Sequence, residues 1–101
     1  MNKSGVDGML GLAMRAGKLV SGSFSVEKAI KSQKAYLVVI AEDASEETKK
    51  GLTDACNYYK KQYMIYSTKE DLGRILGREY RACAAILDEK FAEAVLDKYR
   101  Q

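Results

Sequence analysis

Residues Tyr36–Asp43 read YLVVIAED, and the rest of the chain is organised around this run. Its first five residues are apolar or aromatic, three consecutive ones are β-branched, and no polar residue alternates with them. Such a short run predicts a strand that is buried on both faces and therefore needs helices above and below it. The polar residues that follow, Glu42 to Ser45, predict the start of a helix.

Hydrophobic periodicity predicts that helices and strands alternate on both sides of this strand. The predicted helices span residues 5–16, 25–32, 45–61, 67–77 and 88–96, and the other predicted strands span 18–21, 63–66 and 82–87. Ser23 or Ser25 is expected to cap the second helix, and Asp88 the last one. Strict alternation with short connections predicts one α/β domain, a three-layer αβα sandwich built by right-handed crossovers.

Composition describes a small globular domain with an uneven charge distribution. The 101 residues leave room for one core, and a hydrophobic share of 47% argues against disorder. Residues 1–41 hold six basic and two acidic residues, whereas residues 42–101 hold eleven basic and twelve acidic ones. The positive excess therefore lies in the first part of the chain, as a face that meets a polyanion would require. A set of solvated lysines would give the same count.

Cysteine usage and the N-terminal pattern bear on location. Cys56 and Cys83 lie far apart without CxxC spacing, each within an apolar pattern, which predicts two free buried thiols in a reducing compartment. The N-terminus lacks the layout of a signal peptide, and no run reaches transmembrane length. We expect a cytoplasmic protein with no membrane partner.

No pattern in the chain supports catalysis. Histidine is absent, no GxSxG elbow occurs, and neither a P-loop nor GxGxxG follows a strand. We expect no enzymatic activity, no cofactor and no metal. Glu42 and Asp43 leave one alternative open, because paired carboxylates after a buried strand suit a divalent ion; more commonly such residues cap the next helix.

Two regions have the composition of a ligand site at strand ends. Residues 18–28 combine a Gly-Ser turn with a helix start, and Lys18 and Lys28 add charge. Residues 77–81 place Arg78 and Arg81 on either side of Tyr80, a pattern that suits phosphate contact together with base stacking. Both regions together in a small basic domain favour RNA as the partner, although Tyr80 alone would be interpreted as an ordinary surface tyrosine.

Three separated blocks of the chain carry a family resemblance. The blocks LGLAMRAGKLVSG, KAIKSQKAYLVVIAEDAS and DACNYYKKQYMIYSTKEDLGRILG resemble the small kink-turn RNA binders that include the large-subunit ribosomal proteins seven-Ae and thirty-e. Within that family the chain is most similar to the bacterial YlxQ-like branch, over residues 8–97. The resemblance implies an αβα sandwich with a four-stranded mixed sheet. It also implies a non-enzymatic role in binding a sharply bent RNA helix at tandem sheared G·A pairs, on the ribosome or a structured untranslated RNA.

The resemblance also implies which residues meet the RNA. The family's contact turn reads Gly-x-Asn-Glu-x-x-Lys; here Gly22 and Lys28 match, whereas Phe24 and Ser25 stand where the family has Asn and Glu. Lys18, Lys28 and Arg81 are expected to hold phosphates, and the family's second contact loop falls on residues 78–82. The residues predicted to contact RNA are Lys18, Gly22, Ser23, Phe24, Ser25, Lys28, Lys31, Glu42, Asp43, Arg78, Glu79, Tyr80 and Arg81.

Two other functions remain open at this point. The domain could be a protein–protein module that has kept the fold and lost specific RNA binding, with Phe24 as an interface anchor. It could also be a small enzyme or metal-dependent domain that uses Glu42 and Asp43.

Overall fold

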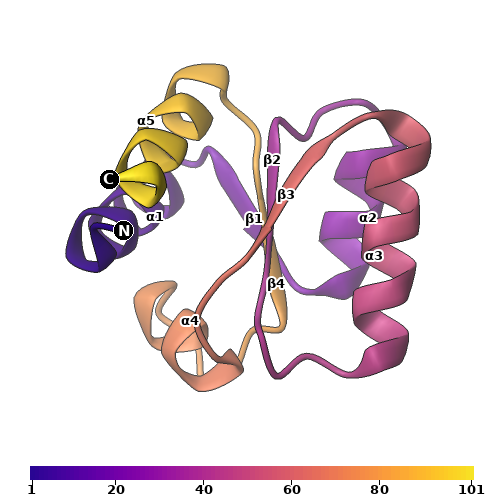
Figure 1. Cartoon of the computed structure of the whole chain (residues 1–101), viewed down its shortest axis with the longest axis horizontal. Coiled ribbons are helices and arrows are strands. Elements are labelled where there is room, and N and C mark those ends of the chain that lie inside the picture. The colour runs from indigo at the N-terminus through magenta and orange to yellow at the C-terminus, as the bar shows by residue number, and fades with distance from the viewer.

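The computed structural model describes residues 1–101, and helices and strands alternate along the chain as predicted (Figure 1). The helices are α1 (Lys3–Arg15), α2 (Ser23–Lys31), α3 (Glu46–Tyr59), α4 (Lys69–Ile75) and α5 (Glu89–Arg100). The strands are β1 (Leu19–Ser21), β2 (Leu37–Ile40), β3 (Gln62–Ile65) and β4 (Cys83–Ile86).

Two helices begin earlier than predicted. α1 begins at Lys3 because Oδ1 of Asn2 accepts a hydrogen bond of 2.9 Å from the backbone N–H of Gly5. α2 begins at Ser23 and its N-cap residue is Gly22, which forms no side-chain cap. The prediction that Ser23 or Ser25 caps this helix is therefore wrong. At φ 91° and ψ 149°, the backbone of Gly22 has a conformation that a residue with a Cβ rarely adopts.

The four strands form one mixed sheet in the order β1-β4-β2-β3. β4 is antiparallel to both of its neighbours, and β2 and β3 are parallel. The mixed sheet agrees with the family resemblance, but the prediction of successive right-handed crossovers is too simple. β4 lies between β1 and β2, so a parallel crossover joins neighbouring strands at β2–α3–β3 alone.

Helices cover both faces of the sheet, which gives the predicted three layers. Figure 1 shows α2 and α3 on one side of the sheet and α1, α4 and α5 on the other. Every residue of β2 and β4, the two inner strands, is buried, as their uninterrupted apolar sequences predict. One core of 26 buried apolar residues contains both free cysteines, Cys56 and Cys83. None of the helices combines the length and apolarity that crossing a membrane requires.

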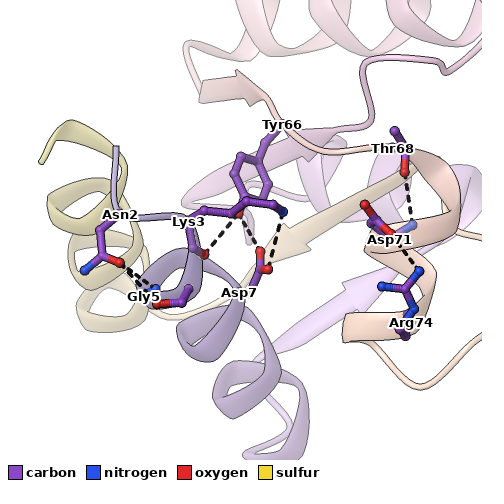
Figure 2. Close-up of polar contacts among 9 residues, drawn as sticks. Asn2, Lys3, Gly5, Asp7, Tyr66, Thr68, Asp71 and Arg74 are labelled. Atoms are coloured by element: carbon purple, nitrogen blue, oxygen red, sulfur yellow. Dashed lines mark hydrogen bonds and ion pairs between the residues drawn. The ribbon is translucent and has the colours of Figure 1, made fainter.

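A polar cluster ties α1 to the end of β3 (Figure 2). The Tyr66 hydroxyl donates a hydrogen bond to the Asp7 carboxylate and also lies 3.2 Å from the carbonyl oxygen of Lys3. Nζ of Lys3 lies 3.5 Å from the second Asp7 oxygen. Burial raises the pKa of Tyr66 above its ordinary value, and the hydrogen bond to Asp7 adds to this effect. The cluster holds α1 beside the segment that leads from β3 into α4.

Candidate nucleic-acid interface

The strand directions bring four connections to one edge of the sheet. β1, β2 and β3 run in one direction and β4 in the other, so three strands end where β4 begins. This edge carries residues 21–24, 41–45, 66–68 and 77–82, and we call it the loop edge; it is the lower edge of the sheet in Figure 1. The two segments that the sequence singles out, around Gly22 and around Tyr80, both lie on it.

The turn between β1 and α2 leaves the first backbone N–H groups of α2 without a side-chain cap. The N–H of Gly22 donates to the carbonyl oxygen of Cys83 over 3.1 Å, which fixes the turn against the first residue of β4. The other four helices each have a side-chain cap, from Asn2, Ser45, Thr68 and Asp88, whereas α2 has none. The first N–H groups of a helix have no acceptor within the helix, so the start of α2 presents free donors at the loop edge.

Arg81 connects the two predicted regions. Its Nε donates a hydrogen bond of 2.8 Å to Oγ of Ser21, the last residue of β1, and one terminal nitrogen donates to the Tyr80 carbonyl oxygen over 3.0 Å. The backbone N–H of Arg81 also donates to the carbonyl oxygen of Lys69, over 3.1 Å. The guanidinium is thereby held beside the β1–α2 turn, although the two segments are 60 residues apart in the sequence.

The loop of residues 77–81 packs closely on α4. The N–H of Arg78 donates to the carbonyl oxygen of Gly73 over 2.7 Å. A Cβ on Gly73 would lie 2.8 Å from the carbonyl oxygen of Glu79 and 2.8 Å from Cα of Tyr80. Gly73 therefore permits the close approach that sets the path of this loop. Arg78 and Glu79 are exposed and form no ion pair, and the Tyr80 side chain is 56% exposed.

The surface of α2 beside the loop edge carries an aromatic ring and two lysines. Phe24 is 83% exposed, so it points to solvent and not into the core. Lys28 is exposed and has no ion-pair partner, whereas Nζ of Lys31 lies 2.9 Å from Oε1 of Glu27. Ser23 is exposed and Ser25 is half-buried.

Two predicted contact residues have different positions or partners than expected. Lys18 precedes β1, and its carbonyl oxygen accepts from the N–H of Leu87, so it lies at the opposite edge of the sheet from the turn. Asp43 does not cap α3, because Ser45 does so through a hydrogen bond of 3.1 Å from the N–H of Thr48. Oδ1 of Asp43 instead accepts from the N–H of Lys69 over 2.7 Å, at the first residue of α4.

Glu42, by contrast, is exposed at the loop edge, and its N–H donates to the carbonyl oxygen of Ser67 over 2.8 Å. No group of three or more Asp, Glu, Cys or His side chains in the chain has an arrangement that could hold a metal ion.

The comparison with known families agrees with this arrangement. The model of the ribosomal protein L7Ae/L30e/S12e/Gadd45 family matches residues 5–96. The chain belongs to this family. The matched residues include the whole loop edge and all five predicted contact residues on α2.

Individual members of this family resemble the chain over most of its length. It is 46% identical over 88 residues to the RNA-binding protein YlxQ of Bacillus subtilis (strain 168), which covers 87% of this chain and 88% of that protein. It is 36% identical to the large ribosomal subunit protein eL8 of Cenarchaeum symbiosum (strain A), over 85% of this chain and 69% of that protein.

Solved structures show the same fold. A protein of unknown function from Bacillus halodurans C superposes with a TM-score of 0.90 at 30% identity, over 95% of this chain and 97% of that one. The Giardia lamblia 15.5kD RNA binding protein superposes with a TM-score of 0.80 at 23% identity, over 92% of this chain and 79% of that one, and it supports the fold alone.

Two residues that build the loop edge of this family member were not predicted. Ser21 accepts the Arg81 hydrogen bond, but nothing in the sequence marks one serine of a serine-rich turn as the partner of a distant arginine. Gly73 could have been identified from the sequence, since an isolated glycine inside a short helical pattern usually has a packing reason.

Proposed function

We propose that this protein is a cytoplasmic, non-enzymatic RNA-binding protein that recognises a kink-turn or a similarly bent RNA helix in association with translation. The observation that carries the proposal is the convergence of two distant segments at the loop edge through the 2.8 Å hydrogen bond between Arg81 and Ser21. Family membership and the similarity to proteins named as RNA-binding and ribosomal support it.

The geometry of the loop edge suits a bent phosphate backbone. Gly22 has no side chain, and nothing lies within 4 Å of the position where a Cβ would project, so a backbone can approach the turn closely. The uncapped start of α2 offers N–H donors and the positive end of the helix dipole to a phosphate. From Ser21 to Val26 the turn contains no acidic residue that would repel RNA.

Cationic side chains border the turn on two sides. Arg81 is oriented by its bond to Ser21, and its guanidinium can pair with a phosphate as a planar fork. Lys28 lies on α2 without a competing carboxylate partner. These contacts position RNA by shape, while Ser23 and Ser25 offer hydroxyl groups to base edges at the G·A pairs.

The experiment that tests this function is a titration against two labelled RNA hairpins at one stated salt concentration. One hairpin carries a kink-turn, and in the other the tandem G·A pairs are replaced by Watson–Crick pairs. We expect tight binding to the first and a large loss of affinity on the second. Equal and weak binding to both hairpins would contradict the proposal and would indicate that the surface attracts RNA by charge alone.

A substitution tests the proposed phosphate contact. We expect Lys28→Ala to weaken binding to the kink-turn RNA and to flatten the slope of log K against log salt by about one unit, because one counterion fewer is released. The matched control is Lys90→Ala, an exposed lysine on α5 that also has no ion-pair partner and lies away from the loop edge. If both variants keep the wild-type slope, Lys28 is not a phosphate contact.

A further inference from the structure

Phe24 is the most exposed large apolar side chain of the protein, at 83%. It lies in the first turn of α2, next to the uncapped helix start and the Gly22 turn. Leaving an aromatic ring in water forfeits the free energy that its burial would supply, so a ligand that covers this phenylalanine beside the candidate site would gain that free energy.

Two surface hollows flank the ring along α2. One, of about 420 Å³, is lined by Phe24, Glu27, Lys28, Lys31 and Ser32. The other, of about 300 Å³, lies toward β1 and the chain after α2, and it shares Phe24, Lys28 and Ser32 with the first. Phe24, Lys28 and Ser32 therefore lie between the two hollows, and Lys31 lines the first hollow whereas Lys34 lines the second.

The chemistry of the first hollow favours a nucleic-acid strand over a protein surface, and in the second hollow Lys28 and Lys34 lie beside the apolar residues Val20, Ala29 and Leu87. Phe24 is the sole hydrophobic residue that lines the first hollow, whereas the core of a protein interface is apolar and depleted of lysine. An isolated aromatic ring among cations is the arrangement that binds single strands, with a base stacked on the ring and phosphates on the lysines. Lys28 and Lys34 have no ion-pair partner, and the exposed pair of Lys31 with Glu27 costs little to open.

We propose that an unpaired segment of the bound RNA runs along α2, with one nucleobase stacked on Phe24 and its phosphates beside Lys28 and Lys34. This inference rests on the proposed function and adds a second determinant to it. A base inside a duplex has both faces covered by its neighbours, so only an unpaired nucleotide next to the bent helix can stack on the ring. The protein then recognises the bent RNA helix at the loop edge and the unpaired RNA segment along α2.

The absence of tryptophan from the chain gives a direct reporter. Phe24→Trp places a single indole at the stacking position, and stacking of a base on an indole quenches its fluorescence. We expect strong quenching by a kink-turn hairpin that carries an unpaired strand beside the bent helix. The matched RNA, in which a complementary strand pairs those nucleotides, should quench much less.

Affinity measurements complete the test. We expect Phe24→Ala to weaken binding of the RNA with the unpaired strand by about fivefold or more, with an unchanged salt slope because no charge is lost. Phe24→Tyr should retain most of the affinity, and Phe24→Leu, which is apolar but cannot stack in the same way, should behave like Phe24→Ala. Since the side chain is on the surface, thermal melting should show that all variants are folded.

The outcomes separate this inference from the proposed function. If the wild type discriminates the kink-turn from its Watson–Crick control but Phe24→Ala binds equally well, the proposed function stands and the stacking inference is overturned. Equal quenching by the paired and unpaired RNAs would also overturn it. A sedimentation shift of the wild type that Phe24→Ala abolishes, with RNA affinity unchanged, would assign the ring to protein contact instead.

Discussion

Tyr66 shows how one buried hydroxyl links segments far apart in the sequence. The residue is 4% exposed, and its hydroxyl donates to Asp7 of α1 (Figure 2). Lys3 completes the cluster, with Nζ 3.5 Å from the Asp7 carboxylate and 5.4 Å from the centre of the Tyr66 ring. The hydroxyl can donate one hydrogen bond, and giving it to the carboxylate satisfies the acceptor that carries the charge.

Replacing Tyr66 by phenylalanine tests this cluster. We expect Tyr66→Phe to lower the free energy of unfolding by about 1–2 kcal/mol near pH 8, because Asp7 loses a donor in a partly buried position. Urea denaturation measures the change. Asp7→Asn serves as the companion variant, since it keeps an acceptor for the hydroxyl while removing the charge.

The pH dependence of the same comparison has a defined sign. The pKa of Tyr66 is raised in the folded protein, so above the ordinary tyrosine pKa of about 10 the unfolded chain loses a proton that the folded chain keeps. The stabilisation by Tyr66 is therefore complete below pH 10 and decreases as the pH rises further. Burial also raises the pKa of Cys56 to about 11, but this contribution is the same in both proteins. We expect the stability difference between wild type and Tyr66→Phe to shrink from pH 8 to pH 10.5; a constant difference would contradict the raised pKa.

Two helical glycines show how the same residue type plays opposite roles in two elements. Gly73 in α4 faces the backbone of residues 79 and 80, whereas Gly51 in α3 has no atom within 4 Å of the position of an added Cβ. Gly73 is needed for packing, and Gly51 carries only the entropic cost of a glycine in a helix. Gly73 thus lowers the helix propensity of α4 but permits the loop that follows to pack on it.

The pair gives a matched prediction. We expect Gly73→Ala to destabilise the protein by about 1–3 kcal/mol and to weaken RNA binding, because the loop with Tyr80 and Arg81 must move. Gly51→Ala should stabilise the protein by about 0.5–1 kcal/mol and leave RNA binding unchanged. Thermal unfolding and the kink-turn titration measure both effects. Unaltered RNA affinity in a folded Gly73→Ala variant would separate the loop from the site.

The order of the sheet makes the last strand the centre of the molecule. β4 is the only hydrogen-bonded partner of β1, and it also pairs with β2. The β1–α2 turn, which carries most of the candidate site, is therefore held in place by residues near the end of the chain.

A truncated chain tests this dependence. We expect residues 1–81 alone to show no cooperative unfolding and no kink-turn discrimination, because β1 has no partner and the core loses one of its two inner strands. Circular dichroism and hydrogen exchange are the measurements, and a synthetic peptide of residues 82–101 added in trans is the control for recovery. A cooperative transition in the truncated chain would show that β2, β3 and the first helices form a stable unit without β4.

The candidate site was predictable in part. The sequence singles out the two segments around Gly22 and Tyr80 because glycine, serine and cation-aromatic patterns are local properties of the chain, and the structure brings the two segments together. Lys18 lies at the opposite edge of the sheet from the Gly22 turn because β1 separates the two, as the predicted strand over residues 18–21 itself implies. Asp43 was assigned to the wrong helix because a carboxylate can accept from any nearby helix start, and here α4 lies within reach.

The sequence by itself determined the type and order of the nine elements, since hydrophobic periodicity and capping residues act within a few neighbours along the chain. It also determined that residues 37–40 and 83–86 are inner strands, because only strands covered on both faces tolerate uninterrupted apolar sequence. Only the tertiary structure decided that β4 enters between β1 and β2. That pairing brings Arg81 to Ser21, because strand order is set by contacts between residues that are distant in the chain. The tertiary structure also shows that Phe24 faces solvent.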